Sequence, residues 1–146
     1  MNRTMTVFVL GATLAVSLPA WAHTEEYFDS VEAPHGGQLR MAGPYHLELV
    51  AKDGELTLHV MDHADYKIST DGGMGKATIQ NGKTKTQVKL QPTGDNTLKG
   101  AGDFSVKPES VVIVFIRLPD QEAYSARFAP LKPTNTPVKK HQHGKP

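Results

Sequence analysis

The chain has 146 residues, no cysteine and a formal net charge of +1 at pH 7. Its length suits a single domain. The lack of cysteine excludes disulfides and thiolate ligands, so a bound metal would need imidazole, carboxylate, thioether, amide or amine groups. The nearly balanced charge argues against nucleic-acid binding, which requires a series of phosphates to be neutralised.

Residues 1–22 have the pattern of a secretory signal peptide. Arg3 supplies a positive charge, residues 6–16 form a short apolar core, and Ala20-Trp21-Ala22 has the small-x-small form that signal peptidase cleaves. We therefore expect export, with His23 as the mature N-terminus and no membrane anchor. The free amine and imidazole of that residue would form a chelate for Cu(II).

The exported part divides into an arm, a domain and a tail. Residues 23–36 are polar and acidic and predict a flexible arm, whereas 130–146 are rich in Pro, Lys and His and predict a disordered tail. Residues 37–129 alternate in strand fashion between Gly, Asn, Asp and Pro turns, with no helical period. The expected strands are 38–41, 45–51, 55–62, 76–80, 83–90, 97–101, 111–118 and 123–128. This pattern predicts a single all-β domain, an antiparallel β-sandwich or a barrel-like sheet, with disordered termini.

Two hairpins can be given a register from the sequence. Asn81-Gly82 is a strong two-residue turn signal and would place Ile79 opposite Thr84. Asp53-Gly54 marks the second turn. A two-residue loop there gathers four apolar side chains on one face of the hairpin: Leu47, Leu49, Leu58 and Val60. Because a one-residue slip would break up this apolar face, we predict the two-residue register or a four-residue loop of the same parity.

The opposite face of the same hairpin carries the residues best suited to metal binding. These are His46, Glu48, His59 and Met61, in two cross-strand pairs. Directly opposed β-carbons lie about 4.5–5.5 Å apart and diagonal neighbours about 7–8 Å, so two imidazoles and a thioether could converge on one ion. Imidazole suits Cu, Zn and Ni, and thioether favours Cu(I). His63, just after the strand, is a further candidate.

Other histidines extend the candidate set. His35 lies in a Pro-His-Gly-Gly turn, and His141 and His143 form a pair in the tail. The predicted metal ligands are His46, His59, Met61, His35, His63 and His23. The alternative for the strand face is an ordinary solvated surface, with a weak pair between Glu48 and His59. For the turn and tail, the alternative is plain solvated residues.

No pattern indicates an enzyme. The chain has no Gly-x-Ser-x-Gly motif, no cysteine nucleophile and no calcium loop. The glycine-rich stretch at 72–75 lacks the Lys-Ser/Thr of a phosphate-binding loop.

Three short segments carry a resemblance to a known group of proteins. They are Pro34-His35-Gly36-Gly37, the Glu-Leu-Val of 48–50 and Asp53-Gly54. Over about residues 34–65 the chain resembles small exported bacterial proteins that accompany heavy-metal and copper efflux systems, and a short segment of the periplasmic adaptors of such pumps. The resemblance implies a periplasmic location and metal handling. It does not say which residues bind the metal.

Together these observations predict a periplasmic protein that binds copper or a similar divalent transition metal, for buffering, delivery or resistance, with an efflux component as a possible partner. One alternative is a non-catalytic interaction module that docks on an envelope or efflux component. The less favoured alternative is a secreted enzyme with a copper site at the N-terminal His23.

Overall fold

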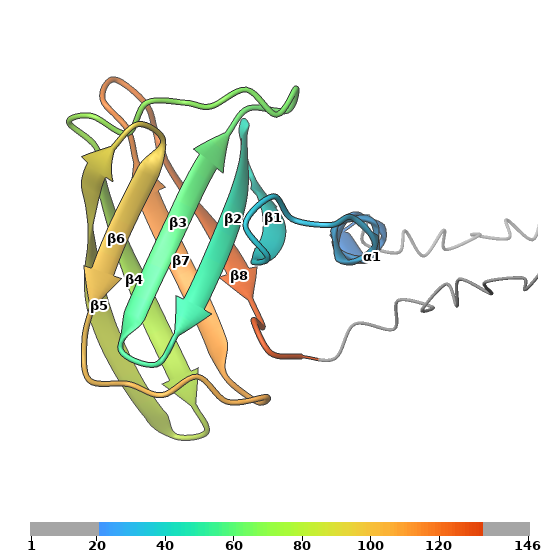
Figure 1. Cartoon of the computed structure of the whole chain (residues 1–146), viewed down its shortest axis with the longest axis vertical. Coiled ribbons are helices and arrows are strands. Elements are labelled where there is room, and N and C mark those ends of the chain that lie inside the picture. Colours follow the sequence, from blue (N-terminus) through green and yellow to red (C-terminus); the bar gives the residue numbers. More distant parts are fainter. Residues whose placement is uncertain (1–20, 133–146) are drawn as a thin grey trace, which may run out of the picture.

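The computed structural model describes residues 21–132 as an eight-stranded antiparallel sheet that curls into a nearly closed barrel (Figure 1). The strands are β1 Gln38–Ala42, β2 Tyr45–Lys52, β3 Glu55–Met61, β4 Met74–Asn81, β5 Thr84–Gly94, β6 Thr97–Ala101, β7 Val111–Arg117 and β8 Ala123–Phe128. Their order in the sheet is β1-β2-β3-β6-β5-β4-β7-β8. The predicted all-β class and all eight expected strands are confirmed, with ends shifted by a few residues.

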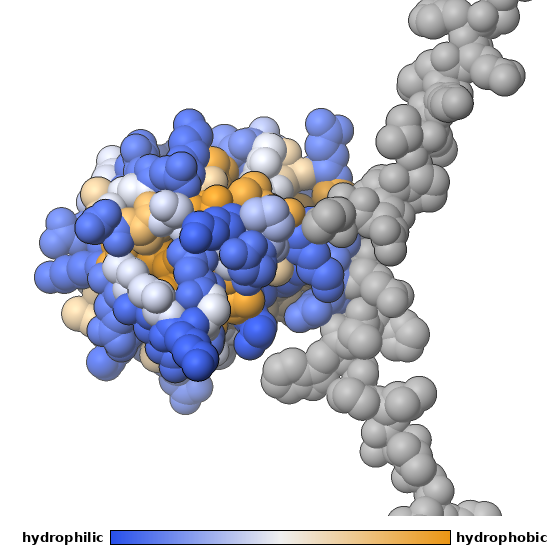
Figure 2. Space-filling view, turned by 90° about the horizontal axis from the view of Figure 1, so that it is seen from below, coloured by the Kyte–Doolittle hydropathy of each residue, from blue (hydrophilic) through white to orange (hydrophobic). Residues whose placement is uncertain are grey.

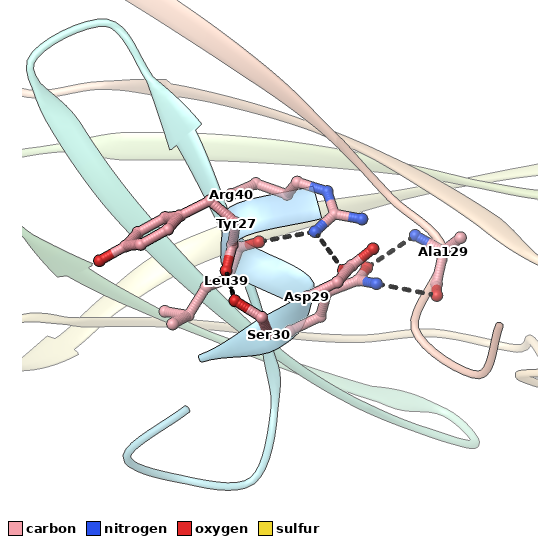
Figure 3. Close-up of polar contacts among 7 residues, drawn as sticks. Tyr27, Asp29, Ser30, Leu39, Arg40 and Ala129 are labelled. Atoms are coloured by element: carbon pink, nitrogen blue, oxygen red, sulfur yellow. Dashed lines mark hydrogen bonds and ion pairs between the residues drawn. The ribbon is translucent and has the colours of Figure 1, made fainter. Parts of the chain in front are cut away.

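The barrel is completed by side-chain hydrogen bonds where β1 meets β8. The Gln38 side chain donates to the Ala129 carbonyl at 3.2 Å and accepts from the Ala129 amide at 2.8 Å. Figure 3 shows both bonds at Ala129. The Gln38 side chain therefore links β1 to the residue that follows β8. Over residues 21–132, these two edge strands do not pair through their backbones.

Alternating apolar side chains fill the barrel. The largest fully buried ones include Phe128, Leu47, Leu49, Leu58, Ile79, Leu90 and Ile116. Seen from one end, apolar residues lie at the centre and hydrophilic residues surround them (Figure 2). This core is the main source of stability in a cysteine-free domain, since apolar burial contributes about 25 cal/mol per Å².

The Asp53-Gly54 hairpin has the predicted two-residue register. Leu49 lies opposite Leu58, and Lys52 lies opposite Glu55 across the turn. The register predicted for the other hairpin is wrong by two residues: Ile79 lies opposite Thr86, and the loop residues are Gly82 and Lys83. Gly82 has a φ of 59°, a conformation that glycine tolerates at the first position of such a loop. A shift of two residues leaves the buried face unchanged.

A helix occupies part of the predicted flexible arm. Helix α1 spans Trp21–Ser30 and lies outside the barrel beside β1 (Figure 1). Phe28 is buried in a second apolar cluster with Ala33, Leu39 and Met61. The helix is held by tertiary contacts of this kind. Its sequence has no repeating apolar pattern from which a helix could have been predicted.

An ion pair also holds α1 to the barrel. The Arg40 guanidinium donates to Asp29 at 2.9 Å and to the Leu39 carbonyl at 2.8 Å (Figure 3). The arm therefore acts as a cover for the outer face of β1 and its neighbours.

Some predictions lie outside the described residues. These are most of the signal peptide, at residues 1–20, and the tail from 133 onward with His141 and His143. Within residues 21–132, no helix is long and apolar enough to cross a bilayer.

Candidate functional site

The candidate site lies on the outer face of β2 and β3, beneath α1 and residues 31–37. The predicted cross-strand pairs are present: His46 lies opposite Met61, and Glu48 lies opposite His59. We call His35, His46, His59 and His63, with Glu48, the histidine face. The sequence left open a solvated strand surface here. Instead, Glu48 is fully buried and only 15% of the His46 side chain is exposed.

Glu48 organises one end of the histidine face. One carboxylate oxygen accepts hydrogen bonds from the backbone N–H groups of His35 at 2.8 Å and Gly37 at 3.0 Å. The other oxygen lies 2.7 Å from Nδ1 of the His35 ring. The Glu48 carboxylate therefore bonds to His35 and Gly37. The alternative interpretation paired Glu48 with His59, but the hydrogen bonds of Glu48 go to the Pro-His-Gly-Gly turn instead. Three such bonds satisfy a carboxylate that would otherwise be costly to bury.

The Pro-His-Gly-Gly turn is shaped for this contact. Gly36 has a φ of 72°, in the left-handed region that favours glycine. A β-carbon on Gly37 would lie 2.4 Å from the Leu49 carbonyl oxygen, so only glycine lets the turn approach β2 this closely. The two glycines thus let the turn lie against β2, where His35 contacts Glu48.

His35 and His59 form a stacked pair at this end. Their ring centroids are 3.7 Å apart and their planes differ by 4°. Burial lowers the pKa of His59, and the charge of nearby His35 lowers it further, outweighing the opposing effect of Glu48. The lowered pKa favours the neutral form of His59, which is the form that binds metals. Because imidazole lone pairs lie in the ring plane, two parallel rings cannot direct them at one ion until a ring rotates.

His46 and His63 form a second pair. Their centroids are 4.7 Å apart and their planes are tilted by 48°, so the two ring planes intersect. His46 Nδ1 lies 3.3 Å from an Asp65 carboxylate oxygen, and His63 Nε2 lies 3.0 Å from the Gly43 carbonyl oxygen. The ring of Phe28 packs edge-on against His46 at 5.0 Å. Helix α1 is thus in direct contact with this pair.

The loop after β3 positions His63. Asp62 accepts hydrogen bonds from the amides of Ala64 at 2.8 Å and Tyr66 at 2.9 Å, which closes a tight turn. Asp65 has a φ of 64°, which directs the chain back toward the sheet. Asp62 and Asp65 thus both shape this turn, and Asp65 also contacts the His46 imidazole.

Three imidazoles share one feature that suits metal binding. In His35, His46 and His63, one ring nitrogen faces a carboxylate or carbonyl oxygen, which assigns the N–H to that side. In the neutral form of each ring, the other ring nitrogen carries the lone pair. Histidine ligands of metals almost always have such a partner on the second nitrogen, because it fixes the tautomer and raises basicity.

The remaining predicted ligands have other positions. Met61 lies opposite His46 but is only 6% exposed, within the apolar cluster under α1. His23 falls in α1, and its side chain is outside the described part of the structure. Over residues 21–132 no three His, Asp or Glu side chains are already placed to hold one ion. The structure brings the histidines together as two pairs.

Sequence reasoning missed three parts of this site: the orienting role of Glu48, the contact of Phe28 and the partnership of Asp65. Of these, only the role of Glu48 could have been suspected from the sequence. Glu48 is a carboxylate between two apolar strand residues, Leu47 and Leu49, and it follows a His-Gly-Gly turn. No protein-family model, curated protein or solved structure gives a significant match to this chain.

Proposed function

We propose that this protein is an exported metal-binding protein that captures a transition-metal ion at the histidine face, for buffering or delivery, with copper as the best fit. The observation that carries the proposal is the set of three imidazoles whose second ring nitrogen already bonds to an acceptor oxygen. In the neutral form of each ring, the other nitrogen carries the lone pair that would bind the ion. A periplasmic location follows from the predicted signal peptide and is part of the proposal.

The choice of copper rests on the chemistry of the available groups. The face offers imidazole nitrogen, and the Met61 thioether lies next to it, opposite His46 but buried under α1, so it would have to turn toward the ion. Zinc and nickel accept imidazole equally, but the thioether adds a preference for Cu(I). The chain has no thiolate, which would otherwise dominate binding of a soft ion.

The arrangement in pairs favours a site that exchanges its ion. Capture requires at least one ring of the stacked pair to rotate, so part of the binding energy is used to rearrange the site. A site of this kind releases its ion more readily than one preformed with four ligands, which suits delivery better than storage. The exposed Asp65 and the half-exposed His35 provide the entrance.

A copper titration of the protein starting at His23 tests the proposal. The double variant His46→Ala, His59→Ala removes one imidazole from each pair and should abolish most of the binding. The matched control His141→Ala, His143→Ala removes the same number of imidazoles from the tail and should retain it. Imidazole NMR resonances of the face should shift in the parent protein.

The proposal would be contradicted if the His46→Ala, His59→Ala variant kept its copper binding and the His141→Ala, His143→Ala variant lost it. That result would place metal capture in the tail. Binding that survives both double variants and is lost in His23→Ala would place it at the terminal chelate. A parent protein that binds no metal would favour the alternative of an interaction module. Binding should also weaken at acidic pH, because protonated imidazole does not bind metals.

A further inference from the structure

A second surface of the barrel has an unusual distribution of charge. Strands β4, β5, β7 and β8 contain no Asp or Glu. Five exposed cationic side chains belong to these strands: Lys76, Lys85, Lys89, Arg117 and Arg127. The chain has 16 basic and 15 acidic residues, yet these four adjacent strands carry no carboxylate. Positive and negative side chains are therefore unevenly distributed over the barrel surface.

Strand register places these cations on the same side of the sheet. Lys76 lies opposite Lys89 on one neighbouring strand and opposite Phe115 on the other. The residues alternating with them are buried in the barrel, for example Ala77 and Val88. The five cations therefore all point outward, and we call this surface the basic face.

The basic face is not neutralised by the protein itself. None of its five cations forms an ion pair with another side chain among residues 21–132. The acidic residues nearest in sequence, such as Asp71 and Glu122, lie in loops at the ends of the strands. An uncompensated set of cations creates a local positive potential even when the net charge is small.

Two exposed apolar side chains stand among the cations. Phe115 is 45% exposed, and the Lys76 ammonium lies 5.9 Å from its ring centroid. Met74, opposite Arg117, is 58% exposed. Aromatic and apolar groups surrounded by Lys and Arg are typical of surfaces that bind at the boundary between lipid headgroups and acyl chains.

We propose that the basic face docks the protein on an anionic phospholipid bilayer. The face is a broad sheet surface on which flexible cationic side chains recognise diffuse negative charge. Lys and Arg near such a bilayer are attracted by its surface potential, and the attraction is additive over several residues. Phe115 and Met74 would insert between headgroups, which gives a lipid surface an advantage over a nucleic acid.

The position of the basic face fits the proposed metal site. In the sheet order, β4 and β7 lie across the barrel from β2 and β3, as Figure 1 also shows. Docking through the basic face would therefore leave the histidine face directed away from the bilayer. The inference itself does not depend on metal binding.

Co-sedimentation with phospholipid vesicles, in the presence of EDTA, tests the inference. The protein starting at His23 should bind vesicles containing phosphatidylglycerol, bind phosphatidylcholine vesicles far more weakly, and be released by salt. The double variant Lys76→Glu, Lys89→Glu should bind at least about tenfold more weakly. Phe115→Ala should also weaken binding, with an unchanged far-UV circular dichroism spectrum.

The matched control is Lys52→Glu, Lys107→Glu, which changes the net charge equally at exposed positions away from the basic face. It should bind within about twofold of the parent. Three results would overturn the inference: no binding of the parent to phosphatidylglycerol vesicles, an equal loss in the control, or tighter binding to a DNA duplex than to vesicles at the same salt concentration. All three are readable whether or not the histidine face binds copper.

Discussion

Replacement of Glu48 tests whether one buried carboxylate holds the histidine face in place. Glu48→Ala would leave the N–H groups of His35 and Gly37 without their acceptor, which the structure places at 2.8 and 3.0 Å. These two N–H groups are partly buried, and an unsatisfied buried donor costs about 1–3 kcal/mol, so the variant should lose at most about 2–6 kcal/mol of unfolding free energy. The half-exposed His35 ring can rebond to water and adds little.

Glu48→Gln is the matched control for this experiment. The glutamine oxygen can still accept from both backbone N–H groups, and its amide can donate to His35 Nδ1 after a change of tautomer. The expected loss is therefore only about 1 kcal/mol, the difference between a charged and a neutral acceptor. Urea unfolding followed by circular dichroism measures both values, and amide hydrogen exchange reports Gly37 directly. Equal stability of Glu48→Ala and the parent, with Gly37 still protected, would refute the role assigned to Glu48.

Three further perturbations separate the core, the turn and the titrating group. Leu49→Ala should cost about 2–5 kcal/mol in urea unfolding, because Leu49 is fully buried in the barrel, yet leave copper affinity unchanged. Gly37→Ala should cost about 1–3 kcal/mol and weaken copper binding, since its β-carbon would collide with the Leu49 carbonyl oxygen. Burial, followed by the charge of His35, lowers the pKa of His59, so the unfolded chain binds the proton more tightly and stability should fall as the pH drops below about 6.5. His59→Asn should show a flatter pH dependence in the same assay, and a slope identical to that of the parent would contradict this assignment.

The fold could be predicted from the sequence because its determinants are local. Strands alternate with a period of two, and turn residues mark their ends, so β2 and β3 could be paired residue by residue. The error at Asn81-Gly82 shows the limit of this reasoning. Either dipeptide, Asn81-Gly82 or Gly82-Lys83, can form the loop, and both keep Ile79 in the core.

The candidate site was only partly predictable, because its contacts join segments that carry no periodic signal. The hairpin parity located His46 and His59 on one face, but it gave no indication that α1 would cover them. Phe28 packs there from a short helix, beside Met61 and edge-on to His46. Likewise, His63 and Asp65 reach the face through a turn whose direction depends on one positive φ angle.

Alternation in one short segment of β2 links the barrel core to the proposed function. Leu47 and Leu49 point into the barrel, and Glu48 between them points outward to hold His35. A register slip of one residue would therefore place a carboxylate in the core and two leucines beneath α1 at the same time. The Asp53-Gly54 turn prevents this slip by fixing Lys52 opposite Glu55. The same register that gives the barrel its core thus brings His46 and His59 to one outer surface, where the turns at residues 34–37 and 62–65 add His35 and His63.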